Sequence, residues 1–137
     1  PDTFSVIASF SGAIYKNALP FEEDSGSPFF LTTRYAKSIF KDQDYYDSHG
    51  NQLFKAIEKV ENPSDLKIFM TCGTEDWLLD KSREFSRFLF EKGVPVIYKE
   101  KSGGHEWDFW DWSIKEFLDW WIPEDADLGV SSGNVRS

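Results

Sequence analysis

The stretch Leu66–Asp76 reads LKIFMTCGTED, an apolar run that stops at a glycine and is followed by two carboxylates. Short apolar runs bounded by turn residues are typical of strands buried on both faces of a parallel sheet. We therefore predict a strand over Leu66–Cys72 that ends at Gly73, with polar side chains directly past its end.

Downstream, the pattern alternates between helix and strand. Asp80–Lys92 has apolar residues on one helical face and is stopped by Gly93, which predicts a helix. Val94–Lys99 is the next predicted strand, with Pro95 at its start or on a sheet edge because proline has no N–H to donate. Trp107–Trp121 is the last predicted helix. We predict that one apolar stripe of this helix faces the core: Trp107, Trp110, Ile114, Phe117, Leu118 and Trp121.

Upstream, Phe4–Phe10 is an apolar run that predicts another buried strand, and Gln52–Val60 has helical spacing. Residues 13–50 between them contain many turn-forming residues. Within them we predict a helix over Thr33–Phe40 and loop over Asp42–Asn51. A long irregular insertion of this kind is usually a lid or a binding surface.

The order strand, insertion, helix, strand, helix, strand, helix predicts an α/β fold in which helices flank a parallel sheet. Residues 1–122 are expected to form this unit, with 13–50 as a lid-like insertion. Residues 123–137 are acidic and then rich in Gly and Ser, which predicts a flexible tail. Functional residues gather past the carboxyl ends of parallel strands. Asp76 and His105 should therefore lie at the same edge.

Composition excludes several classes of function. The formal charge of −9 argues against non-specific binding to nucleic acid or to an anionic membrane. No apolar run approaches the roughly 20 residues that span a bilayer. The lone Cys72 excludes an internal disulfide, and two distant histidines give no metal-ligand cluster, so no cofactor or metal is expected. Because residue 1 is a proline, we expect a processed chain or a fragment, and no compartment is assigned.

His105 follows the pair Gly103-Gly104, which can hold an imidazole at a sharp turn. Histidine suits proton transfer near neutral pH, but a catalytic histidine needs a carboxylate to orient it and a nucleophile to activate. Asp76 is the candidate carboxylate. The chain order serine, acid, histidine is that of α/β-hydrolases, and Asp76 followed by His105 matches its last two places.

Thr71–Leu78 (TCGTEDWL) and Gly103–Trp110 (GGHEWDFW) resemble segments of the esterase D-like branch of the α/β-hydrolases. That branch includes tributyrin esterases, S-formylglutathione hydrolases, and feruloyl and acetylxylan esterases. The resemblance extends over about residues 1–122 and implies that Asp76 is the triad acid and His105 the triad base. The family's G-x-S-x-G elbow and its early oxyanion loop have no counterpart here.

The resemblance therefore implies the C-terminal half of a serine carboxylesterase acting on short acetyl- or butyryl-type or related esters. The expected partners are a small acyl ester and an N-terminal portion of the same enzyme that carries the serine. The chain alone is predicted to be inactive, and homo-oligomerisation stays open. Candidate walls of the substrate site are aromatic: Trp77, Phe21, Phe29 and Phe30.

Each candidate also has a structural interpretation. Asp76 competes with Glu75, which we expect to be a solvated neighbour, and with Asp80, a candidate helix N-cap. Glu106 and Asp108 would favour the first turn of the last helix through its dipole.

Other residues are equally open to a structural interpretation. His105 could be a turn histidine packed on Trp107, whereas His49 lies in a polar segment and is expected to be solvated. Cys72 is expected to be buried packing and not a nucleophile. The alternative function is a non-catalytic α/β module that binds carbohydrate or protein through its aromatic surface.

Overall fold

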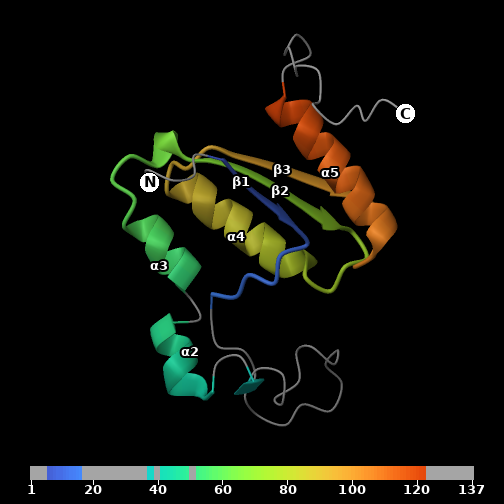
Figure 1. The fold of residues 1–137 in the computed structure, drawn as a ribbon. Helices are drawn as coiled ribbons and strands as arrows, with labels where there is room; N and C mark the ends of the chain where they lie inside the picture. The colour runs from blue at the N-terminus through green and yellow to red at the C-terminus, as the bar shows by residue number, and fades with distance from the viewer. Residues whose placement is uncertain (1–5, 17–36, 39–40, 50–51, 123–137) are drawn as a thin grey trace, which may run out of the picture.

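The computed structural model describes residues 6–16, 37–38, 41–49 and 52–122. Three strands in this part form a parallel sheet in the order β1-β2-β3 (Figure 1). They are β1 (Val6–Phe10), β2 (Lys67–Gly73) and β3 (Val96–Lys101). The predicted parallel α/β fold is confirmed. Pro95 leads into β3, where its carbonyl accepts a hydrogen bond from the Ile68 N–H at 3.0 Å.

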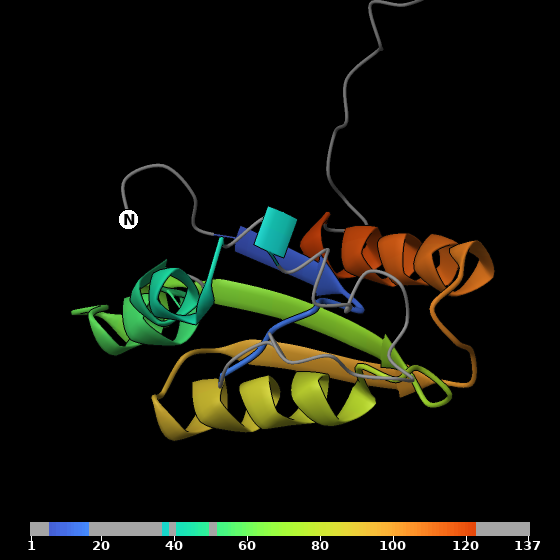
Figure 2. The ribbon, with the colours of Figure 1, turned by 90° about the horizontal axis from the view of Figure 1, so that it is seen from below.

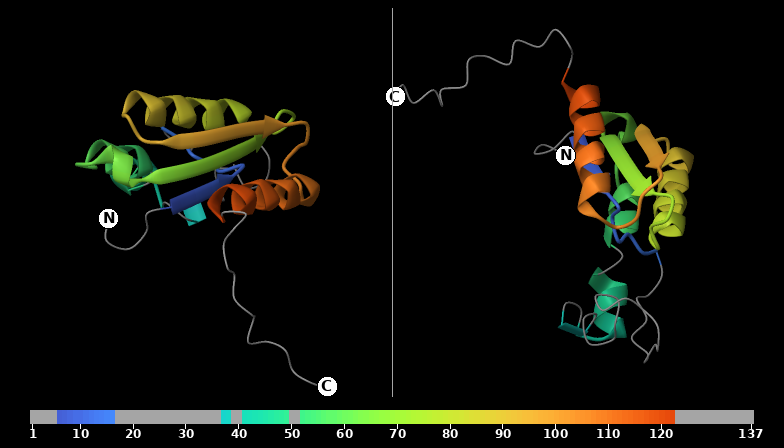
Figure 3. Two further views of the ribbon diagram at one scale, coloured as in Figure 1. Left: turned by 90° about the horizontal axis from the view of Figure 1, so that it is seen from above. Right: turned by 90° about the vertical axis from the view of Figure 1, so that its right-hand side faces the viewer.

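Helices cover both faces of the sheet. Helix α4 (Leu79–Glu91) lies on one face and α5 (Trp107–Trp121) on the other, as Figures 2 and 3 show. In the described part before β2 lie the shorter helices α2 (Gln43–His49) and α3 (Gln52–Glu58) and a 3₁₀ turn (Pro63–Asp65). The α3–β2–α4–β3–α5 order matches the predicted alternation, with ends shifted by one or two residues.

The core on the α4 side holds the central strand in place. The Phe54 ring of α3 packs on Phe85 and Phe88 of α4, with ring centroids 4.9 and 4.8 Å apart. Full burial of one such apolar side chain contributes about 1.5–3 kcal/mol, so the cluster anchors β2 and the loop after it. The buried members come from α3, β2, α4 and the residues beside them: Phe54, Ile57, Leu66, Ile68, Met70, Phe85, Phe88, Leu89 and Val94.

The prediction of loop over Asp42–Asn51 is wrong, because helix α2 occupies most of that segment. The Asp42 carboxylate accepts a hydrogen bond from the Tyr45 N–H at 2.8 Å, as an N-cap residue does. Tyr46 is the buried anchor of α2. A helix with one buried side chain has too few apolar residues to show a period in the sequence. His49 therefore lies on a helix, exposed as expected.

The predicted core stripe of α5 is also wrong. Its buried residues are Phe109 and Ser113, while Trp107 remains 74% exposed and Ile114 43% exposed. Phe117 and Trp120 pack on the Phe69 ring of β2 at 5.6 and 5.4 Å. Large apolar residues occur on more than one face of α5, so periodicity alone could not select the buried one. Other members of the predicted stripe are also exposed: Leu118 and Trp121.

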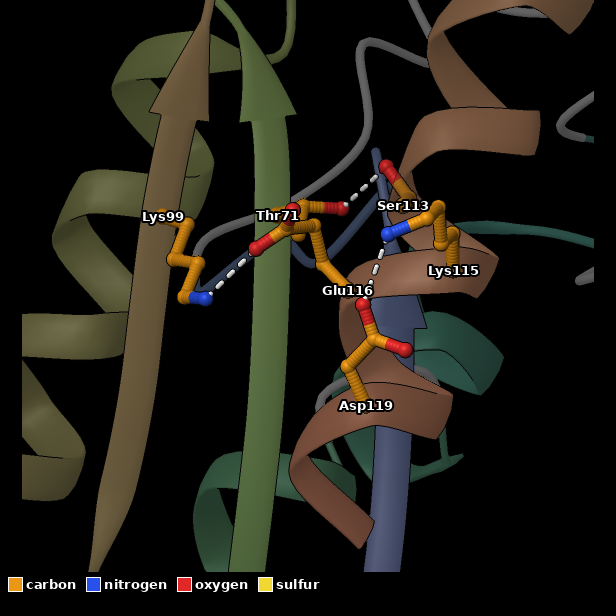
Figure 4. Close-up of polar contacts among 6 residues, drawn as sticks. All are labelled: Thr71, Lys99, Ser113, Lys115, Glu116 and Asp119. Carbon is orange, nitrogen blue, oxygen red and sulfur yellow. Dashed lines mark hydrogen bonds and ion pairs between the residues drawn. The ribbon is translucent and has the colours of Figure 1, made fainter. Parts of the chain in front are cut away.

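Buried hydroxyl groups join α5 to the central strand of the sheet. The Thr71 hydroxyl donates to Ser113 Oγ at 2.8 Å (Figure 4). The Ser113 hydroxyl in turn donates to the Phe109 carbonyl at 2.9 Å. At the side of this contact, Lys99 of β3 pairs with Glu116 at 2.6 Å. These contacts hold the middle of α5 against the sheet, and the loop that carries His105 leads into the same helix.

Most of the predicted insertion lies outside the described residues. In this region, the residues outside the described part are 17–36, 39–40 and 50–51. They include nearly all of the predicted helix over Thr33–Phe40. The predicted tail, 123–137, and residues 1–5 also lie outside the described part.

Candidate active site

Two loops at the carboxyl edge of the sheet bring Asp76 and His105 together. Gly73 at the end of β2 lies opposite Lys101 at the end of β3, so the loops that follow start side by side. His105 Nδ1 lies 3.0 Å from Asp76 Oδ2. The Asp76 side chain is fully buried, whereas 24% of the His105 side chain is exposed. The pair thus has a protected acid and an accessible imidazole.

The Asp76 carboxylate is held by groups on both sides. Its Oδ1 accepts a hydrogen bond from the Leu78 N–H at 2.9 Å, and its Oδ2 lies 3.0 Å from His105 Nδ1. A buried carboxylate needs such donors to offset the loss of water. With a proton on Nδ1, His105 donates to Oδ2, and its Nε2 then presents the lone pair that can take up a proton.

Two tryptophan rings flank the imidazole. Trp77 lies at 4.5 Å from the His105 ring centroid and is tilted by 35°, and Trp110 meets that ring edge-on at 4.9 Å. Trp77 is 44% exposed. It is therefore placed where a bound molecule at His105 could also contact it. The other candidate pocket walls, Phe21, Phe29 and Phe30, lie outside the described residues.

Glu75 is exposed, as expected of a solvated neighbour, but it also binds the loop that carries His105. Its carboxylate accepts hydrogen bonds from the Gly103 N–H, from the Thr74 hydroxyl at 2.8 Å, and from the Ser102 hydroxyl at 3.4 Å. The pKa of Glu75 lies below its ordinary value, chiefly because the Gly103 N–H donates to the charged form. Nothing in the sequence distinguishes this carboxylate from other exposed ones, since its main partner is a backbone N–H.

The two loops are also joined through their backbones. The Thr74 N–H donates to the Lys101 carbonyl at 2.9 Å, and the Glu75 N–H donates to the Gly103 carbonyl at 3.1 Å. A Cβ atom at Gly73 would lie 2.0 Å from that same Gly103 oxygen. Glycine at position 73 therefore permits the close approach of the two loops that carry Asp76 and His105.

The remaining acidic candidates have structural positions. Asp80 is not the N-cap of α4, because Leu78 occupies that position, and Asp80 lies exposed in the first turn. Glu106 occupies the N-cap position of α5 and accepts a hydrogen bond from the Gly104 N–H at 3.0 Å, while Asp108 lies in the first turn.

Cys72 is fully buried, which confirms the prediction that it is packing. Burial raises the pKa of its thiol, the opposite of what an activated cysteine requires.

Three further features concern the described part of the chain as a whole. Its residues contain no group of three or more His, Cys, Asp or Glu side chains placed to hold a metal ion. None of its helices combines the length and the apolar character needed to cross a bilayer. A groove of about 670 Å³ does occur, but it lies at the amino ends of the strands, where Lys67, Pro95 and Trp121 contribute to its lining. It is thus at the opposite edge from Asp76 and His105.

The fold is part of that of an α/β-hydrolase, as comparison with solved structures shows. No family model matches the chain. The sequence is 31% identical over 93 residues to an acetyl esterase of Caldicellulosiruptor saccharolyticus, covering 66% of this chain and 35% of that esterase. A solved ferulic acid esterase has a TM-score of 0.58 at 20% identity, covering 85% of this chain and 41% of its own.

Two Staphylococcus aureus structures are similar as well. S-formylglutathione hydrolase FrmB has a TM-score of 0.55 at 22% identity, and the match covers 87% of this chain and 45% of that one. The fluorophosphonate-binding serine hydrolase FphF has a TM-score of 0.54 at 21% identity, with the same shares. The chain spans about a third of the sequence relative and less than half of these structures. The chain is thus similar in sequence to part of an acetyl esterase and shares its fold with part of these solved hydrolases, as the sequence resemblance predicted.

Proposed function

We propose that this chain supplies the general base and its orienting acid to a serine carboxylesterase. The observation that carries the proposal is the 3.0 Å contact between His105 Nδ1 and the buried carboxylate of Asp76. Asp76 keeps the imidazole oriented with its proton on Nδ1, and it stabilises the imidazolium that forms when Nε2 takes up a second proton.

In the proposed reaction, a serine Oγ attacks the acyl carbonyl while His105 Nε2 takes the serine proton. The tetrahedral intermediate collapses as the ester C–O bond breaks, and His105 returns the proton to the leaving alcohol. A water molecule then attacks the acyl-enzyme, again giving its proton to His105. Expulsion of the serine oxygen, which regains a proton from His105, releases the carboxylic acid.

The proposed substrates are short acyl esters of the acetyl or butyryl type, or related esters. Support comes from the similarity to an acetyl esterase and to a solved ferulic acid esterase. Trp77 beside His105 is the proposed wall of the acyl or alcohol site. Phe21, Phe29 and Phe30 are proposed to contribute from the insertion over residues 13–50, which would cover the site.

We propose that the serine and the oxyanion hole come from an N-terminal portion of the same enzyme. The chain contains no G-x-S-x-G. Among the described strands, β1 is an edge of the sheet, and its Ile7 is 41% exposed. Exposed apolar residues of α5, namely Ile114, Leu118 and Trp121, form a second uncovered surface. A partner that adds a strand beside β1 and packs on α5 would cover both.

The test compares the isolated chain with the chain combined with the native polypeptide that carries the serine. The isolated chain should not hydrolyse p-nitrophenyl acetate above the buffer background. The combined enzyme should hydrolyse it and be labelled at the serine by a fluorophosphonate. Asp76→Asn should lower kcat by roughly 10⁴, while His49→Ala on α2 should leave kcat unchanged.

Two outcomes would contradict these proposals separately. His105-dependent turnover by the isolated chain would refute the need for a partner. A loss of tenfold or less in Asp76→Asn of the combined enzyme would refute the role of Asp76.

The exposed rings of Trp107 and Trp121 support a second candidate, a non-catalytic module that binds carbohydrate or protein. Saturable binding of a soluble oligosaccharide, without fluorophosphonate labelling of any co-purifying chain, would favour this module over the esterase.

A further inference from the structure

We propose that Glu75 is a positioning residue: its carboxylate holds the Ser102–Gly104 loop where His105 can pair with Asp76. Glu75 accepts a hydrogen bond from the Gly103 N–H, and its own N–H donates to the Gly103 carbonyl at 3.1 Å. One residue thus binds both the donor and the acceptor of Gly103. Such a two-point contact fixes the orientation of the peptide groups on each side of that glycine.

The loop needs an external restraint because its own sequence provides little. Gly103 has a φ of +146°, in a region that residues with a Cβ rarely adopt, and Gly104 follows it. Consecutive glycines have more conformational freedom to lose than any other pair. The Ser102 hydroxyl approaches both Glu75 carboxylate oxygens at 3.4 Å, which adds a second restraint on the same segment.

The position of this contact links it to the catalytic pair. Glu75 directly precedes Asp76, and Gly103 lies two residues before His105. A shift of the Gly103 peptide relative to Glu75 would therefore move the imidazole relative to its acid. Displacements of about 1 Å in a catalytic group can cost about 10²-fold in rate. Because Glu75 is exposed, water competes for its hydrogen bonds, so its effect on geometry should exceed its effect on stability.

Three substitutions in the 137-residue chain separate the reach of the side chain from its charge. Glu75→Ala removes the acceptor. Glu75→Asp keeps the charge but is one methylene too short to reach Gly103. Glu75→Gln keeps the length and an acceptor oxygen but loses the charge. A matched control is Glu84→Ala, which removes the same charge from a half-buried position on α4, where Glu84 pairs with Lys81.

Two quantities are measured by NMR: the resonance of the His105 Nδ1 proton and the rate of hydrogen exchange at the Gly103 amide. The ring resonances of His49 on α2 serve as the internal reference for the histidine spectrum. Glu75→Ala and Glu75→Asp should lose the His105 resonance and accelerate Gly103 exchange by on the order of tenfold. Glu75→Gln and Glu84→Ala should resemble the unsubstituted chain in both measurements.

Unchanged readouts in Glu75→Ala and Glu75→Asp would overturn the proposal. So would the reverse pattern, in which Asp preserves both signals and Gln loses them, since charge and not reach would then matter. If circular dichroism shows that the Ala variant does not fold, the comparison of Asp with Gln decides. This inference rests on the proposed function in one respect only, namely that His105 is the catalytic base. The test needs neither serine nor ester, so failure of ester turnover is a separate result.

Discussion

Gly73 is the residue on which the approach of the two site loops depends most directly. A Cβ atom there would lie 2.0 Å from the Gly103 oxygen, which is backbone and cannot rotate away. We expect Gly73→Ala to reduce the free energy of unfolding by about 3 kcal/mol, since overpacking that displaces backbone costs at least 1–3 kcal/mol. Urea denaturation measures this change, and the His105 Nδ1 proton resonance should also be lost.

Gly104→Ala is the matched control for Gly73→Ala. Its nearest neighbour would be Glu106 Oε1 at 3.9 Å, an ordinary contact. Its stability should stay within about 0.5 kcal/mol of the unsubstituted chain. Equal losses in the two variants would show that loop glycine content, and not the approach of Gly73 to Gly103, sets the stability.

At this scale the sequence predicted the pairing of Asp76 with His105, because parallel strands place the loops after them at one edge. It did not reveal Glu75. In the sequence, Glu75 looks like any other exposed glutamate. Its main hydrogen-bond partner is the backbone N–H of Gly103, and because every non-proline residue has such a group, the sequence does not show which one a carboxylate will bind. The catalytic assignments themselves remain predictions.

The junction between α5 and β2 depends on two buried hydroxyls. Ser113→Ala would leave the Thr71 hydroxyl buried without its acceptor, because Thr71 donates to Ser113 Oγ. We expect a loss of about 1–3 kcal/mol in the free energy of unfolding. Thr71→Val should cost less, since Ser113 still donates to the Phe109 carbonyl at 2.9 Å.

A double-mutant cycle measured by urea denaturation tests the coupling between Thr71 and Ser113. The combination Thr71→Val with Ser113→Ala should recover most of the loss, because both buried polar groups are gone. Lys115→Ala provides the control on the same helix: its ion pair with Asp119 at 2.8 Å is exposed, so its removal should change the stability little. Strictly additive single effects would contradict the coupling.

The elements themselves were predicted unevenly, for physical reasons. Helix α4 was predictable because its buried Phe85, Phe88 and Leu89 share one face and Gly93 stops it. Helix α5 was predictable in extent but not in orientation. The face that meets β2 contains Ser113, which hydrophobicity would place outside, because close packing and a hydrogen bond to Thr71 decided the contact. Helix α2 was missed since it buries little more than Tyr46.

For the molecule as a whole, alternation of strand and helix was enough to predict the parallel α/β fold. It could not predict which surfaces stay uncovered. The described part leaves β1 at a sheet edge and apolar residues exposed on the outer side of α5. Large exposed apolar surfaces mark interaction sites when they are contiguous. This is the surface on which the proposed N-terminal portion would pack.

Ile114 allows that interaction to be separated from the stability of the chain. Ile114 is 43% exposed on α5, and serine has a helix propensity close to that of isoleucine. Ile114→Ser should therefore change the free energy of unfolding of the isolated chain by less than about 1 kcal/mol. It should weaken binding of the serine-bearing portion by about tenfold, because burial of an apolar side chain of this size contributes about 1.5 kcal/mol or more. Titration calorimetry measures the affinity.

The control is Phe90→Ser, which removes an exposed ring from α4 on the opposite face of the sheet (Figure 2). Phenylalanine and serine also have similar helix propensities, so the two variants differ mainly in the face that they alter. Binding of the serine-bearing portion should be unaffected by Phe90→Ser. If both variants weakened binding equally, the association would depend on general hydrophobicity and not on the α5 face. Sedimentation of the isolated chain tests one more outcome. If Ile114→Ser converted a dimer of this chain to a monomer but left binding of the serine-bearing portion unchanged, α5 would be a homodimer surface.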